Sequence, residues 1–189
     1  MTTSPSKNAI DLTHLHNDSI ADERAWLGHD TPQLQFAATP PVWNGMTFDL
    51  RGAIQLSGNE IHTSPLGFAF PSRIDQVPIQ RKATRLPFLH AMTGDTATEG
   101  AITASFQFHY ATGQSAELLL RHGRESIGWR SSTIPDPQRA VFIADSQGRP
   151  VQLTRTVWEN PHPDTFIESI DLALGEDGRP FVLFSILSE

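Results

Sequence analysis

Apolar and polar residues alternate along several segments of this chain, and this alternation constrains the fold more than any other feature. In residues 101–110, every second side chain from Ile102 onward is apolar. Residues 46–56 repeat the pattern, with Gly52 in line with the apolar positions. A period of two is that of a β-strand with one buried face. Because no long segment follows the helical period of 3.6, the sequence predicts an all-β protein.

Turn-forming residues separate the predicted strands at intervals of about 10 to 15 residues. Further strands are expected at 9–12, 74–81, 86–92, 116–122 and 140–144, and three more within 149–187. The last region is interrupted at 158–164, where Pro161 and Pro163 fix the backbone and lack N–H donors. We interpret this stretch as a rigid corner between two strands. The spacing predicts a single antiparallel β-sandwich of the jelly-roll type.

The bulk properties of the chain narrow the classes of function. Its 189 residues suit one domain, and we expect a disordered tail at 1–7 followed by a single β-sandwich domain at 8–189. The absence of cysteine excludes thiol catalysis and zinc–thiolate sites. The 14 Lys and Arg against 21 Asp and Glu give a net charge of −7. An acidic chain without a basic run is not expected to bind nucleic acid.

No targeting segment is recognisable in the sequence. The first residues are polar and lack the apolar stretch of a signal peptide. No apolar run reaches the length of a membrane-spanning helix. We therefore expect no membrane span and, by default, a cytoplasmic location. The oligomeric state is left open between a monomer and a homodimer.

Motifs for common catalytic chemistries are missing, and we assign no catalytic residue. There is no Gly-x-Ser-x-Gly nucleophile elbow and no glycine-rich phosphate loop. His14 and His16 have the spacing of metal ligands, so a metal-dependent enzyme is one alternative. The same segment offers oxygen ligands, and a second hypothesis is a structural calcium ion held by Asp11, Asn17 and Asp18. A third interpretation is a polar surface loop without an ion.

Residues suited to a sugar ring are frequent at predicted loops and strand ends. Aromatic faces contact the C–H side of a sugar, and planar polar groups bind its hydroxyls. All four tryptophans lie at such positions: Trp26, Trp43, Trp129 and Trp158. Alternating polar residues mark another candidate surface: Asp49, Arg51, Gln55, Ser105, Gln107 and His109. Each set has a plainer interpretation, because the tryptophans can close the ends of the sandwich and the polar residues can form a solvated sheet face.

Short segments spread over residues 10–187 also carry a resemblance. They are residues 10–12 with 17–18, 48–56, 86–91, 108–113, and 155–161 with 167–171. In this order they resemble a bacterial galactose-binding-like jelly-roll carbohydrate-binding module, of the kind found beside glycoside hydrolases and at the C-terminal ends of some membrane-anchored regulators. The resemblance implies a non-catalytic sugar-binding β-sandwich, in some members with a structural calcium ion.

The leading hypothesis is a non-catalytic module that binds carbohydrate or polysaccharide. Its site is expected at one end of the sandwich and is formed by Trp158, Asn160, Arg155, Trp129, Arg130 and His90. Two alternatives stand beside it. One is a protein-interaction or oligomerising β-sandwich without a small ligand, and the other is the metal-dependent enzyme that uses His14 and His16.

Overall fold

The computed structural model describes most of the chain. The described residues are 7–17, 34–35, 42–43, 46–57, 70–92, 98–129, 131, 140–145, 148, 150–176 and 178–189. Most of the predicted tail, residues 1–6, lies outside these ranges.

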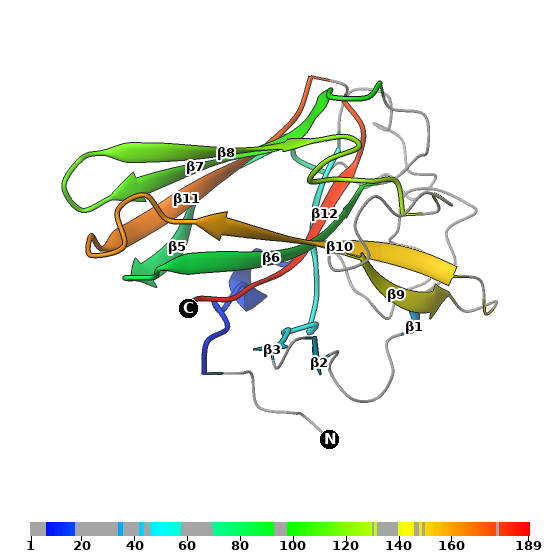
Figure 1. Ribbon diagram of the computed structural model, residues 1–189, viewed down its shortest axis with the longest axis horizontal. Helices are drawn as coiled ribbons and strands as arrows, with labels where there is room; N and C mark the ends of the chain where they lie inside the picture. Colours follow the sequence, from blue (N-terminus) through cyan, green and yellow to red (C-terminus); the bar gives the residue numbers. More distant parts are fainter. Residues whose placement is uncertain are drawn as a thin grey trace.

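Two antiparallel sheets pack face to face (Figure 1). One has six strands in the order β1-β9-β10-β6-β12-β4: Leu34–Gln35, Ala140–Asp145, Pro150–Glu159, Arg85–Met92, Phe181–Ile186 and Ile54–Leu56. The other has four strands in the order β5-β11-β7-β8: Arg73–Arg81, Ile167–Leu174, Ile102–Tyr110 and Ser115–Arg121. A separate pair joins β2 (Val42–Trp43) to β3 (Met46–Thr47), and one 3₁₀ turn, η1, covers Thr13–Leu15.

Eight of these strands wind as a jelly roll, which confirms the predicted fold class. Their antiparallel pairs are nested along the chain: β7 with β8, β6 with β10, β5 with β11, and β4 with β12. Each step outward through this nesting alternates between the two sheets, which gives four strands to each sheet. β9 and β1 extend the first sheet beyond β10.

Aromatic side chains fill the space between the sheets. Phe88 of β6 packs against Phe106 of β7 with ring centroids 4.7 Å apart, and Phe181 of β12 lies 6.1 Å from the same Phe106 ring. All three rings are fully buried. Each buried aromatic side chain of this size contributes several kcal/mol to stability, roughly 3–5 when truncated to Ala. This aromatic layer therefore holds the two sheets together.

Strands β4, β6, β10 and β12 of the six-stranded sheet are largely buried on both faces, whereas the four-stranded sheet is not. A second apolar cluster covers the side of the six-stranded sheet that faces away from the partner sheet, and it includes Phe48, Leu89, Trp129, Val151, Val182 and Phe184. In β7 of the four-stranded sheet, buried and half-buried residues alternate from residue 104 to 110. The outward face of β7 is thus the less buried one, and it carries the polar residues Ser105, Gln107 and His109.

Two sequence predictions about strands were wrong. Residues 46–56 do not form one strand, because β3 ends at Thr47 and β4 begins only at Ile54. Between them Asp49 accepts hydrogen bonds from the backbone and side chain of Arg51, which turns the chain. Residues 9–12 make a single bridge from Ala9 to Leu187 rather than a strand.

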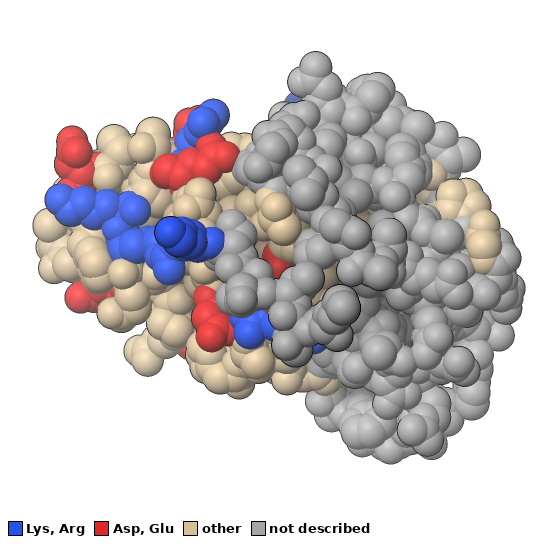
Figure 2. Space-filling model, turned by 90° about the horizontal axis from the view of Figure 1, so that it is seen from below, with Lys and Arg blue, Asp and Glu red and all other residues tan. Residues whose placement is uncertain are grey.

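No helix among the described residues is long and apolar enough to cross a membrane. On the described part of the face seen in Figure 2, basic and acidic side chains lie beside one another rather than in a field of one sign. Neighbouring opposite charges weaken each other's field at a distance.

Candidate functional site

The proline-rich corner after β10 is part of the core. The Trp158 indole stacks on the Phe108 ring of β7, with centroids 3.5 Å apart and an angle of 1° between the planes. Trp158 is only 7% exposed. Because β10 and β7 belong to different sheets, this stack joins the two layers of the sandwich.

Asn160 uses its side-chain amide to fasten the corner. Its Oδ1 accepts from the Tyr110 hydroxyl at 2.5 Å and from the His162 backbone N–H at 2.9 Å. Its Nδ2 donates to the carbonyl oxygens of Ala83 and His162. Burial raises the pKa of Tyr110, so the phenol stays a neutral donor. The hydrogen-bonding groups of Asn160 are therefore committed to the chain itself.

The other members of the predicted sugar site do not gather around this corner. Trp129 is 5% exposed and packs in the cluster on the far side of the six-stranded sheet, opposite to the face that carries Trp158. His90 is fully buried between the sheets. Arg155 is half-buried and lies opposite Leu89 in the β10–β6 ladder. Arg130 lies outside the described residues.

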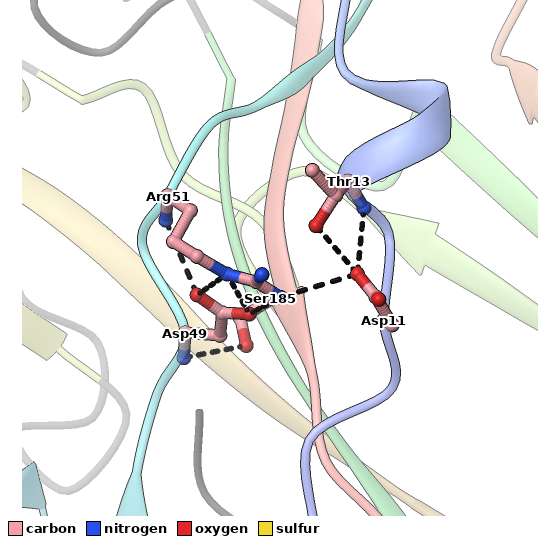
Figure 3. Close-up of polar contacts among 5 residues, drawn as sticks. All are labelled: Asp11, Thr13, Asp49, Arg51 and Ser185. Carbon is pink, nitrogen blue, oxygen red and sulfur yellow. Dashed lines mark hydrogen bonds and ion pairs between the residues drawn. The ribbon is translucent and has the colours of Figure 1, made fainter. Parts of the chain in front are cut away.

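The predicted metal-binding segment takes part in an ion-pair network (Figure 3). Asp11 Oδ1 accepts from the Thr13 N–H at 3.0 Å and from Arg51 Nη2 at 3.1 Å. Hydrogen bonds from the Thr13 side chain and backbone lower the pKa of Asp11. Arg51 binds both carboxylate oxygens of Asp49, which raises the Arg51 pKa, and the Asp49 N–H donates to Ser185 Oγ.

Asn17 and His16 also make contacts within the chain. The Asn17 side chain pairs with the backbone of Gln55, donating to its carbonyl at 2.9 Å and accepting from its N–H at 2.7 Å. The His16 ring lies against Gly52, so closely that a Cβ at Gly52 would overlap it, and burial lowers the His16 pKa. Asp18 lies outside the described residues. Over the described ranges, no three His, Asp or Glu side chains are grouped so as to hold a metal ion.

The outward face of the four-stranded sheet carries a set of ordered polar side chains that still face solvent. In the β7–β11 ladder, the directly opposed pairs are Ser105 with Ala173, Gln107 with Asp171, and His109 with Ser169. On the β8 side, Gln107 is also paired with Glu117. On the β5 side, Ala173 and Ser169 are paired with Arg73 and Pro78. The Gln107–Asp171 pair thus stands in the middle of this face, with the small residues Ser105 and Ala173 on one side and Ser169 on the other.

Asp171 holds this face in order. Its Oδ2 accepts from Arg73 Nη2 at 2.8 Å and lies 3.0 Å from His109 Nε2, while its Oδ1 accepts from the Gln76 N–H at 2.8 Å. Partial burial raises the pKa of Asp171, but the hydrogen bonds from Gln76 and His109 and the charge of Arg73 outweigh it, so the pKa is lowered. The carboxylate is therefore ionised over the physiological range and fixes two neighbouring side chains.

A backbone irregularity in β5 brings the Gln76 N–H to Asp171. Gln76 has φ 58°, in the left-handed region that non-glycine residues seldom adopt. The β11–β5 register shifts between Ile170 and Leu172, beside this residue. Such bulges re-aim groups at functional sites, and left-handed non-glycine residues cost about 1–3 kcal/mol. The cost of the left-handed Gln76 is offset by the charge-assisted hydrogen bond from its N–H to the Asp171 carboxylate.

Phe166 adds an aromatic edge to the same sheet. It is 36% exposed and is the large apolar side chain that the described residues leave most open to solvent. Its carbonyl accepts from the Ala111 N–H, and the next residue pairs with Tyr110, so it lies at the β7–β8 hairpin end of the sheet. An exposed ring beside planar polar groups has the composition of a sugar-binding surface.

Sequence reasoning found only part of this face. Ser105, Gln107 and His109 belonged to the predicted polar surface, and the alternation of β7 identified them. The same prediction grouped them with Asp49 and Arg51, which lie in the network of Figure 3, and with Gln55, which is fully buried. Alternation shows that residues share a face of one strand, but it does not show which strands are neighbours.

Asp171, Arg73 and Phe166 were missed as site residues. The one signal for Asp171 was a charged residue between two apolar ones in a predicted core strand, Ile170 and Leu172. Phe166 follows the prolines of the corner, and its outward position becomes visible only through the pairing of the next residue with Tyr110.

Fold and surface together define a class: a jelly-roll β-sandwich with one sheet buried on both faces and one polar, ordered sheet face. Comparison with protein-family models, with curated proteins and with solved structures gives no match for the chain.

Proposed function

We propose that the protein is a non-catalytic binding module for carbohydrate, with its site on the outward face of the four-stranded sheet. The observation that carries the proposal is the ordered set of Arg73, Asp171 and His109, joined by hydrogen bonds of 2.8 and 3.0 Å. A fixed carboxylate, guanidinium and imidazole offer both acceptors and donors to sugar hydroxyls. Because their geometry is set before a ligand arrives, less conformational entropy is lost on binding.

The shape of the face supports an extended ligand. Ser105 and Ala173 are small and directly opposed on one side of the Gln107–Asp171 pair, and Ser169 is small on its other side, so a chain can approach the sheet closely on both sides of this pair. Phe166 supplies an apolar surface at the hairpin end. This combination favours an oligosaccharide or polysaccharide chain over a compact charged metabolite, and it agrees with the module type that the sequence resembles.

Affinity electrophoresis of the full chain in gels containing single plant or microbial polysaccharides, together with a glycan array, tests the proposal. We expect at least one polysaccharide to retard the wild-type protein. Asp171→Asn should lose that retardation, because it removes the charge that orients Arg73 and His109. The matched control is Glu159→Gln, which removes one exposed negative charge from β10 of the other sheet.

Two results would contradict the proposal. One is no retardation by any polysaccharide and no array signal. The other is binding by Asp171→Asn that equals binding by Glu159→Gln. A protein-interaction module would give the first result and would show a stable homodimer in light scattering.

A further inference from the structure

A second polar site lies inside the sandwich, away from the sheet face described above. Among the described residues, several fully buried side-chain atoms have no hydrogen-bond partner. Four of them belong to residues of one region: His90 Nδ1, Ser126 Oγ, Gln152 Oε1 and Thr154 Oγ1. All four residues are at most 3% exposed. Buried polar atoms without partners cost about 1–3 kcal/mol each, so a native protein seldom leaves four together.

The β10 and β6 strands place three of these side chains on the same face. Gln152, Thr154 and Trp158 alternate with the outward residues of β10, and Trp158 points toward the four-stranded sheet. His90 is the direct ladder partner of Thr154, and the Cβ atoms of opposed antiparallel residues lie about 4.5–5.5 Å apart. This half of β10 extends past the four-stranded sheet toward β9 (Figure 1).

The segment after β8 covers this part of β10 and brings Ser126. The Thr156 hydroxyl donates to the Glu125 carbonyl at 3.1 Å, and the Gln152 N–H donates to the Trp129 carbonyl at 2.7 Å. These two bonds fix the segment against β10 on either side of Thr154. Ser126 lies in the chain between these two fixed points, and it is therefore held close to Thr154.

The hydrogen-bond chain through Thr156 determines the tautomer of His90. Complete burial lowers the pKa of His90 to about 3, so the imidazole is neutral and carries one proton. The proton of Thr156 goes to the Glu125 carbonyl, and the 3.0 Å contact between Thr156 Oγ1 and His90 Nε2 therefore needs the His90 proton on Nε2. His90 Nδ1 is left as a lone-pair acceptor, with the Phe181 ring 5.3 Å from the imidazole.

We propose that His90, Ser126, Gln152 and Thr154 form an internal binding site for a neutral hydrogen-bond donor, namely one or more O–H groups. Nδ1 and Oε1 are obligate acceptors, so the occupant must donate to at least two atoms, while the two hydroxyls adapt to its orientation. An anion has no donor for these acceptors. A cation would be buried without a carboxylate to balance it, which is costly. The O–H groups belong either to ordered water or to a small polyhydroxylated compound.

The stability of a matched pair of variants tests whether the site is occupied. Thr154→Val and Thr156→Val make the same isosteric change two positions apart on one face of β10. Thr156 has two hydrogen-bond contacts, so its variant gives the loss expected for a bonded buried hydroxyl. If Thr154 also binds an occupant, Thr154→Val lowers the midpoint of thermal unfolding by about 2–4 °C.

An unfolding midpoint of Thr154→Val that is unchanged or raised would overturn the proposal. A Thr154 hydroxyl that binds nothing is a buried group without compensation, and its replacement by a methyl group leaves the midpoint unchanged or raises it. Ser126→Ala is a second, independent variant with the same two outcomes, so a folding defect in one does not leave the proposal untested.

A high-resolution crystal structure and a native mass spectrum of the full-length protein show whether the O–H groups belong to water or to a polyhydroxylated compound. Electron density within hydrogen-bonding distance of both His90 Nδ1 and Thr154 Oγ1, with no added mass, identifies water. Density accompanied by an added mass, which Thr154→Val reduces, identifies a bound polyhydroxylated compound. No density near either atom contradicts the site. The result is independent of whether the outer face binds carbohydrate.

Discussion

The corner after β10 and the outward face of the four-stranded sheet contain similar kinds of residues but use them differently. At the corner, Trp158 is stacked in the core, and the Asn160 side chain makes four hydrogen bonds with the chain. At the sheet face, Asp171 orders Arg73 and His109, whose side chains remain 54% and 39% exposed. Residue types that suit a sugar therefore do not identify a site. What matters is whether their polar groups are still open to a ligand.

The largest expected effect on stability is that of Trp158→Ala, which removes the main apolar contact of the corner. Loss of a buried indole stacked on Phe108 should lower the free energy of unfolding by roughly 3–5 kcal/mol. Urea denaturation followed by circular dichroism measures it, with Phe166→Ala as the control for an exposed aromatic residue. If Trp158→Ala instead weakened sugar binding and cost less than about 1 kcal/mol, Trp158 would be a binding platform and the comparison above would fail.

Asn160→Ala is expected to have the next largest effect. It removes the oxygen that accepts from the Tyr110 hydroxyl and the N–H that donates to the Ala83 carbonyl. Because both hydrogen bonds are buried, the free energy of unfolding should fall by about 2–3 kcal/mol. Tyr110→Phe removes only one of these bonds and should cost about 1 kcal/mol. The same denaturation experiment gives both values. Equal losses for the two variants would show that Asn160 contributes only through Tyr110.

Asp171→Asn should separate binding from stability at the sheet face. Because Arg73 and His109 are partly exposed, the stability loss should be at most about 1 kcal/mol. Binding to the polysaccharide that retards the wild type should fall at least tenfold. Titration calorimetry measures the affinity, and Glu159→Gln should leave it unchanged. A large stability loss with intact affinity would make Asp171 a structural residue.

The same variant has a pH signature with a defined sign. The folded-state pKa of Asp171 is lowered, so its contribution to stability is present above its unfolded pKa of about 3.9 and is lost as the pH falls through the folded value. The stability difference between wild type and Asp171→Asn should therefore be constant near neutral pH and shrink in acid. Thermal unfolding over a pH series measures it, and a difference that grew on acidification would contradict the assignment.

Phe166→Ala should have the smallest effect on stability. Its ring is 36% exposed, and surface substitutions usually change stability by about 0.5 kcal/mol or less. Affinity for the same polysaccharide should fall severalfold if the ring contacts a sugar. Unchanged affinity would confine the site to the polar part of the sheet face.

The fold was largely predictable from the sequence, because a strand with one buried face shows its apolar and polar alternation in its own residues. Residues 101–110 and 167–174 lie in strands whose apolar positions face the core. The site was not predictable, because it depends on which strands become neighbours. Arg73 and His109 lie 98 and 62 positions from Asp171 along the chain, and only the nested jelly-roll pairing brings them together.

The corner after β10 shows the same limit of prediction from the sequence. Pro161 and Pro163 predicted a rigid turn correctly, but the stack of Trp158 on Phe108 requires the partner sheet. A tryptophan at a strand end looks the same in the sequence whether it caps a core or faces solvent. His90 was likewise predicted to bind sugar, whereas it is fully buried and contacts Thr156 in the interior.

Titration of the ¹⁵N-labelled protein with an oligosaccharide of the retarding polysaccharide locates the sugar contact residue by residue. We expect the largest changes in amide chemical shift at Gln107, His109, Ser169 and Asp171, and little change at the corner. Largest changes at Trp158–His162 and Trp129, with an unaffected sheet face, would contradict it.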